Sequence, residues 1–270
     1  MPRVVMVHGA FNELWGPNEL TARWLPALRD GLWHHGADLA HTEVEVCFYG
    51  DLFRLDPETI DTAAWERSRA GAAELLESFA GAGTSEDLAG TLGQVASQAA
   101  WDRTVDMVTL MTTDPGITRT ARNRLKELLD PGADVVVAHS LGSVLAYGVL
   151  QSHPEYEVGT LVTLGSPLGT EMGESILPGR GDDGLYPWPG SVRRWVNIAA
   201  VGDRATGQGQ LRPHFGDAVE DRRVDNGHRA HDPEPYLNSS VTGEAVASAL
   251  RRPVDRASES QGSTGVPHRG

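Results

Sequence analysis

One stretch of this 270-residue chain limits its fold more than any other, and it covers residues 134–147. It begins with Asp134 and three consecutive valines, a run typical of a buried strand, and after Ser140 its apolar residues recur at helical spacing. The stretch therefore predicts a strand, a tight turn at Ser140 and a helix. A serine at such a turn projects its hydroxyl above the carboxyl edge of a sheet, beside the free amides of the helix start. The alternative interpretation is that Ser140 only caps the helix.

Similar apolar runs alternate with helical patterns along the rest of the chain. Further strands are predicted over residues 3–9, 43–49, 159–165, 192–203 and 220–227, the last of them a polar edge strand. Helices are predicted over residues 18–36, 62–80, 85–112 and 117–129, after Ser140 to about residue 153, and finally through residue 250. This alternation predicts an α/β fold with a mostly parallel sheet and helices on both faces, in one domain over residues 1–250. Residues 251–270 lack apolar periodicity and are expected to be a disordered tail.

Composition argues against several classes of function. The net charge of −14 is unsuited to non-specific nucleic-acid binding, which needs a basic surface. No apolar run approaches the roughly 20 residues of a membrane span, and the first strand begins without the apolar region of a secretory signal, so a cytoplasmic protein is expected. Cys47, the only cysteine, is predicted to be a buried thiol. No phosphate-loop motif occurs, and Asp182 and Asp183 are expected to be solvated rather than to bind calcium.

The segment from Ala138 to Gly142 reads A-H-S-L-G and resembles the nucleophile elbow, G-x-S-x-G, of the α/β-hydrolase superfamily, specifically its lipase and esterase-like members. Alanine replaces the first glycine of that pattern, which is the mildest possible departure. The resemblance implies an α/β-hydrolase fold whose sheet is reduced at its N-terminal edge, because the first strand begins at residue 3. It also implies that the long helical insertion over residues 57–130 covers the active site as a cap, with ordinary packing on the sheet as the alternative.

In that superfamily a serine, an acid and a histidine follow one another along the chain, and the resemblance assigns each a position here. Ser140 is the expected nucleophile. Asp203 follows a predicted strand and is the expected acid, with a turn-forming aspartate as the alternative. His231 lies between the last strand and the last helix, shortly before a Tyr-Leu pair. It is expected to be the general base in preference to His228, and His214 is less suited because it precedes the last strand.

Two backbone amides are expected to form the oxyanion hole. The resemblance assigns one amide to Ala10, which follows the strand that ends in His-Gly, with Phe11 as the neighbour that could replace it. The other amide is that of Leu141, directly after the nucleophile. Ser166, at the end of a later strand, is a competing nucleophile in principle, but the proline that follows it breaks any immediate helix.

Together these residues predict a serine hydrolase that cleaves an acyl bond of a small-molecule substrate through an acyl-enzyme. The bond is expected to be a carboxylic ester, and no cofactor or metal is required. An amidase, a peptidase or a thioesterase uses the same groups, so these activities remain alternatives. The rival from another class is a hydrolase-fold protein that binds a ligand or a protein partner without catalysis, and the sequence identifies no such partner.

Overall fold

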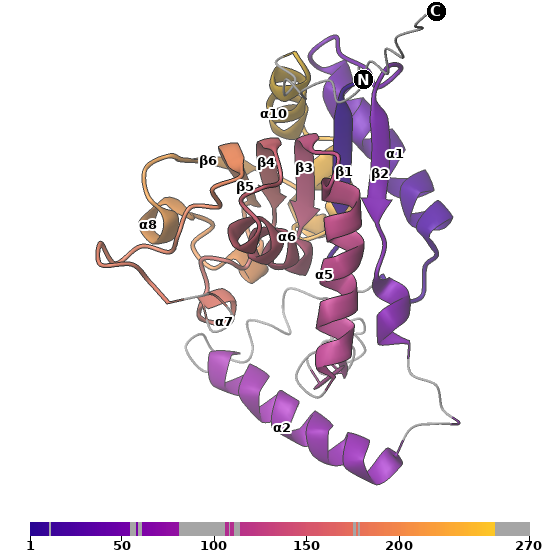
Figure 1. Cartoon of the computed structure of the whole chain (residues 1–270), viewed down its shortest axis with the longest axis vertical. Coiled ribbons are helices and arrows are strands. Elements are labelled where there is room, and N and C mark those ends of the chain that lie inside the picture. Colours follow the sequence, from indigo (N-terminus) through magenta and orange to yellow (C-terminus); the bar gives the residue numbers. More distant parts are fainter. Residues whose placement is uncertain are drawn as a thin grey trace, which may run out of the picture.

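Six parallel strands form one sheet in the computed structural model (Figure 1), which describes residues 1–10, 12–54, 58, 61–80, 106–107, 109–110, 114–174, 177 and 179–251. Their order across the sheet is β2-β1-β3-β4-β5-β6, and every neighbouring pair is parallel. In chain order the strands are β1 (Arg3–Val7), β2 (Glu43–Cys47), β3 (Ala133–His139), β4 (Val158–Leu164), β5 (Val192–Ala200) and β6 (Val219–Val224). The prediction of an α/β fold is thereby confirmed.

Helices connect the strands and pack on both faces of the sheet (Figure 1). Among the described residues they are α1 (Pro17–Trp33), α2 (Thr62–Ala80), α5 (Pro115–Leu129), α6 (Leu141–Ser152), α7 (Glu171–Glu174), α8 (Arg212–Phe215), α9 (Pro233–Leu237) and α10 (Ser240–Leu250). Short 3-10 helices are η1 (Gly50–Phe53), η2 (Arg204–Thr206) and η3 (Gly227–Arg229). No helix within these residues is long and apolar enough to cross a membrane.

The core lies in two layers, one on each face of the sheet. Successive residues of a strand point to opposite faces, so Val4 and Met6 of β1 enter one layer whereas Val5 and Val7 enter the other. The first layer is completed by α1, α9 and α10, and the second by α5, α6 and α8. Because both faces are covered, the central strands read as continuous apolar runs rather than as alternating ones.

The strand order creates a topological switch point between β1 and β3. From β1 the chain passes through α1, on one face, to β2; from β3 it passes through α6, on the opposite face, to β4. Adjacent strands whose helices leave to opposite faces form a topological switch point, and ligands of open α/β sheets bind outside the carboxyl ends of such strands. Helix α2 lies beyond the carboxyl ends of the strands in Figure 1, where it contacts α7.

Several element ends differ from the sequence prediction for local reasons. The helix predicted from residue 117 begins at Pro115, because the Asp114 side chain accepts a hydrogen bond from the Gly116 amide at 2.7 Å and caps the first turn. The strand predicted to reach Tyr49 ends at Cys47, since the Tyr49 amide turns to the His8 ring instead of the sheet. The helix over residues 62–80 is confirmed as α2. The helix predicted over residues 85–112 and the tail beyond 251 lie outside the described residues, apart from 106–107 and 109–110.

Candidate active site

Ser140 occupies the turn between β3 and α6 in a strained backbone conformation. Its φ of +53° and ψ of −129° make it the one non-glycine residue with positive φ in the described part of the chain. Such a conformation persists only where the surroundings hold it. Here the Ser140 amide donates to the Leu164 carbonyl at 2.9 Å, and the Ser143 hydroxyl donates to the Ser140 carbonyl at 2.5 Å. The Ser140 side chain makes no helix-capping hydrogen bond, so the capping interpretation is wrong.

The elbow packs backbone against backbone on the loop that follows β1. A Cβ on Gly142 would lie 2.4 Å from the His8 carbonyl oxygen and 2.5 Å from that of Val7. A Cβ on Gly9 would lie 2.6 Å from the Cβ of Ser140. Contacts this short exclude any side chain at either glycine, which explains why the elbow has glycine two residues after the serine.

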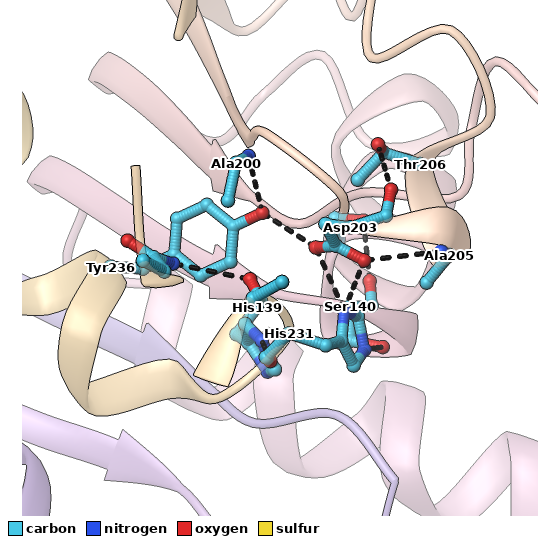
Figure 2. A network of polar contacts seen from close by, with 11 residues as sticks. His139, Ser140, Ala200, Asp203, Ala205, Thr206, His231 and Tyr236 are labelled. Carbon is cyan, nitrogen blue, oxygen red and sulfur yellow. Dashed lines mark hydrogen bonds and ion pairs between the residues drawn. The ribbon is translucent and has the colours of Figure 1, made fainter. Parts of the chain in front are cut away.

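Three side chains from segments that follow three different strands form a continuous hydrogen-bonded chain (Figure 2). The Ser140 Oγ lies 3.0 Å from Nε2 of His231, and Nδ1 of His231 lies 3.0 and 2.9 Å from the two carboxylate oxygens of Asp203. Because an ionised carboxylate only accepts hydrogen bonds, Nδ1 carries the ring proton and Nε2 is left to accept the hydroxyl proton of Ser140. This is the tautomer that a general base for the serine requires.

Asp203 follows β5 at the start of η2, and its side chain is fully buried. One carboxylate oxygen accepts from the Ala205 amide at 3.1 Å, and the other accepts from the Tyr236 hydroxyl at 2.5 Å. Burial acts to raise the pKa of Asp203, but the hydrogen bond and positive charge of His231, helped by Tyr236, outweigh it and hold the pKa below its ordinary value. The carboxylate is therefore ionised at neutral pH.

His231 lies in the loop between η3 and α9, with 22% of its side chain exposed. Its carbonyl oxygen accepts a hydrogen bond at 2.8 Å from Nε2 of His139, the residue before Ser140 (Figure 2). The neighbouring Ala230 carbonyl accepts from the Asn226 side chain at 3.2 Å. The loop is thus fixed through its main chain as well as through the bond between the imidazole and Asp203.

The loop after β1 presents a backbone amide beside the elbow. The Gly9 carbonyl accepts from Nδ1 of His8 at 2.7 Å and from the Asn12 amide at 3.1 Å, and Asn12 also donates to the Ala10 carbonyl at 2.8 Å. The C=O and N–H of a trans peptide point in opposite directions, so fixing the Gly9 carbonyl also fixes the direction of the Ala10 N–H. Phe11, the predicted substitute for Ala10, lies outside the described residues.

The amide of Leu141 is the second donor available at the elbow. It is the first N–H of α6, and the first amides of a helix have no partner within the helix. A Cβ built on Gly9 would lie 3.3 Å from the Leu141 nitrogen, so the β1 loop and the start of α6 are adjacent. The loop after β1 and the start of α6 thus meet beside Ser140, and the amides of Ala10 and Leu141 are the candidate donors of an oxyanion site.

His8 is itself fixed as a neutral ring. Its Nε2 accepts from the Tyr49 amide at 3.0 Å, so the proton is on Nδ1, which donates to Gly9. Burial lowers the pKa of His8 to about 4. The ring of Tyr49 stacks on it with centroids 4.0 Å apart. His8 therefore stays uncharged around neutral pH and holds the loop through its hydrogen bond to the Gly9 carbonyl.

The other candidates from the sequence occupy different places in the fold. His228 is exposed in η3, and His214 lies in α8. Ser166 is buried and bonds to the Ser143 hydroxyl at 2.7 Å. Burial raises the pKa of the Cys47 thiol to about 12, so it is not a nucleophile at neutral pH. The structure thus brings Ser140, Asp203 and His231 together, as the sequence predicted.

Sequence reasoning missed the supporting side chains His139, Tyr236 and Asn12. His139 lies next to Ser140 and Tyr236 lies five residues after His231, but neither spacing indicates which atom the ring contacts. No group of three or more histidine, cysteine, aspartate or glutamate side chains among the described residues is placed to hold a metal ion. A groove of about 410 Å³ lies elsewhere and is lined by Pro115, Thr118, Arg119, Arg122, Asn123, Lys126 and His153.

Comparison with known proteins gives no match: no protein-family model, curated protein or solved structure corresponds to this chain. What the site can do therefore follows from its own atoms. It holds a strained serine, a histidine in the tautomer of a base, a buried ionised acid and, at Ala10 and Leu141, two candidate amide donors.

Proposed function

We propose that this protein is a serine hydrolase of the α/β-hydrolase type that cleaves a carboxylic ester through an acyl-enzyme. The observation that carries the proposal is the continuous chain from Ser140 through His231 to the buried Asp203, with 3.0 Å between the hydroxyl and the base. Its position at the switch point of a parallel sheet supports the same conclusion. The A-H-S-L-G elbow, which resembles that of lipases and esterases, adds the likeness in sequence.

In the proposed acylation step, the Ser140 oxygen attacks the carbonyl carbon of the ester while its proton passes to Nε2 of His231. Asp203 stabilises the imidazolium that forms, because it stays ionised and accepts from Nδ1. The amides of Ala10 and Leu141 donate to the negative oxygen of the tetrahedral intermediate. When the intermediate collapses, the bond to the alcohol oxygen breaks and His231 returns its proton to the leaving alcohol.

Deacylation repeats these steps with water. His231 takes a proton from the water as its oxygen attacks the acyl carbon, and the Ser140 oxygen leaves with the proton that His231 returns. The products are a carboxylic acid and the free enzyme. The chain's own residues supply every proton transfer in this scheme.

The helical insertion supports a covered site. Helix α2 lies on the side of the sheet to which the strands' carboxyl ends point, and it contacts α7, which follows β4 (Figure 1). We infer that α2 belongs to a cap that limits which acyl groups reach Ser140. Amides and thioesters would react through the same groups, so the leaving group is the property that substrate assays must determine.

Labelling with a fluorophosphonate probe, followed by mapping of the adduct, tests the proposal. We expect the adduct on Ser140, none on the Ser140→Ala variant, and normal labelling of Ser152→Ala, an exposed serine of the same helix. Residual hydrolysis in Ser140→Ala should be lower than in the wild type by about 10³-fold or more. An adduct on another residue, or one that persists in Ser140→Ala, would overturn the mechanism.

Parallel assays with p-nitrophenyl esters, the matching anilides and the matching thioesters then identify the bond that is cleaved. We expect the highest kcat/KM for esters. Labelling of Ser140 without turnover of any of these compounds would instead support the non-catalytic alternative, a ligand-binding protein that keeps the triad geometry.

A further inference from the structure

His139 forms a hydrogen bond with the main chain of His231, the candidate base, and this bond defines which nitrogen of His139 carries the proton. Its Nε2 lies 2.8 Å from the carbonyl oxygen of His231, 92 residues away in the chain. A carbonyl only accepts hydrogen bonds, so Nε2 must carry the proton. In the neutral ring this leaves Nδ1 as a bare acceptor.

That second nitrogen has no partner. Among the described residues, Nδ1 of His139 is the one buried side-chain nitrogen or oxygen without a hydrogen bond. An unsatisfied buried acceptor lowers stability, and native structures retain few of them. This unsatisfied acceptor lies beside the strained Ser140. We take its presence there to indicate that the ring serves through the hydrogen bond of its other nitrogen, Nε2.

The surroundings of His139 keep the ring uncharged. Its neighbours are the rings of Trp24, Tyr236 and His231, with centroids 6.1, 5.9 and 5.0 Å away. Burial, reinforced by the charge that His231 can carry, lowers the pKa of His139 to about 3. His139 therefore stays neutral when His231 takes up the proton of Ser140, and it does not compete for that proton.

We propose that His139 is a positioning residue for the base: its Nε2–H fixes the main chain of His231 and thereby holds the imidazole between Ser140 and Asp203. The inference rests on the proposed function of this site. Asp203 holds the ring end of His231, and His139 holds its backbone end. With both ends fixed, Nε2 remains 3.0 Å from the Ser140 oxygen. A displacement of about 1 Å at such a contact costs roughly a hundredfold in rate.

Two substitutions with amide side chains of different length test whether the position of the donated hydrogen bond matters, or only the presence of a polar side chain. In His139→Gln the side-chain amide reaches about as far as Nε2 and can still donate to the His231 carbonyl, whereas in His139→Asn it reaches only as far as Nδ1. We expect kcat to fall about 10- to 100-fold in His139→Asn with little change in KM. His139→Gln should keep kcat within about threefold of the wild type and an unchanged pH profile, because His139 itself does not titrate near neutrality. His228→Asn, which alters an exposed histidine of the same loop region, is the matched control and should behave as wild type.

Unfolding in urea shows whether any loss reflects instability rather than positioning. If His139→Asn is labelled by the fluorophosphonate as fast as the wild type, or if His139→Gln loses as much activity as His139→Asn, the proposal is overturned.

A second measurement does not depend on turnover. In long-range ¹H–¹⁵N spectra His139 should remain the neutral tautomer protonated at Nε2, and the Nδ1 proton of His231 should exchange with water faster in His139→Asn than in His139→Gln. Equal exchange rates would overturn the positioning role. Failure of the wild type to react with the probe, with these spectra as expected, would overturn only the proposed hydrolase function.

Discussion

Tyr236 ties the acid of the site to the end of β5. Its hydroxyl donates to Asp203 at 2.5 Å and accepts from the Ala200 amide at 2.7 Å, and the residue is fully buried. Both hydrogen positions are defined, because the amide can only donate and the carboxylate can only accept. Tyr236 thus supplies Asp203 with a hydrogen bond that does not depend on the protonation of His231.

Removing this hydroxyl should weaken the fold more than the reaction. In Tyr236→Phe the Ala200 amide loses its partner in a buried place, so we expect the free energy of unfolding to fall by about 1–3 kcal/mol. The pKa of Asp203 should rise toward its ordinary value. We expect kcat to fall by only about tenfold or less, because Asp203 still holds His231. Urea unfolding and ester hydrolysis measure the two effects.

Tyr147→Phe is the matched control for this substitution. The Tyr147 hydroxyl donates to the Pro187 carbonyl at 2.7 Å, away from the Asp203 carboxylate. Its loss should lower stability by about 0.5–1.5 kcal/mol and leave kcat unchanged. Equal losses of kcat in both variants would show that the Tyr236 hydroxyl has no specific effect on the acid.

Helix α6 contains two glycines, Gly142 and Gly148, whose surroundings differ. A Cβ on Gly142 would meet backbone carbonyl oxygens of β1 and the loop after it at 2.4 and 2.5 Å, and backbone cannot move aside as a side chain can. A Cβ on Gly148 would lie 3.4 Å from the guanidinium of Arg122, an ordinary contact distance. The start of the helix is tightly packed at Gly142, whereas there is room for a methyl group at Gly148.

We therefore expect Gly142→Ala to destabilise the protein by about 1–3 kcal/mol or more, as overpacking does. It should also slow fluorophosphonate labelling, because the elbow and the Ala10 loop are forced apart. Gly148→Ala should be neutral or stabilising by up to about 1 kcal/mol, since alanine is the better helix former. Denaturant unfolding and labelling rates of the two variants check this, and similar behaviour of both would contradict the close contact at Gly142.

Sequence periodicity predicted all six strands. The central strands read as apolar runs because both faces of the sheet are covered, whereas the edge strands β2 and β6 also carry polar residues. The end of β2 was predicted two residues too late, since it depends on the hydrogen bond from the Tyr49 amide to the ring of His8, which follows β1. Helices α8 and α9, with four and five residues, are too short to show helical periodicity and were not predicted. Local pattern therefore determines which elements form, whereas contacts between elements determine where they end.

The candidate triad was predictable for a similar reason. Ser140 and Asp203 follow parallel strands and His231 follows the last strand, so all three come to the same edge of the sheet. The supporting roles of His139 and Tyr236 depend on how a ring is oriented against a residue far away in the chain. The spacing of residues in the sequence does not predict the orientation of a ring, which only the folded structure shows.

Across the whole molecule, two histidines buried at the ends of neighbouring strands couple the site to global stability. His8 follows β1 and His139 is the last residue of β3, and each donates a ring N–H to a carbonyl of a loop at the candidate site. Both must remain neutral in the fold, with pKa values of about 4 and about 3. In the unfolded chain each ring takes up a proton near its ordinary pKa of about 6.5.

The protein should therefore lose stability on mild acidification. Below about pH 6.5 the unfolded state binds one more proton per buried histidine than the folded state does, so the free energy of unfolding falls as the pH falls, by about 1.4 kcal/mol per pH unit for each ring. This loss of stability continues down to the pKa values of the folded state and then stops.

Urea unfolding between roughly pH 6 and pH 5 isolates the effect, because carboxylates such as Asp203, whose pKa is lowered, begin to contribute only near their ordinary pKa of about 4. His139→Gln should reduce the slope by one proton, and equal slopes in His139→Gln and wild type would mean that His139 is not held neutral.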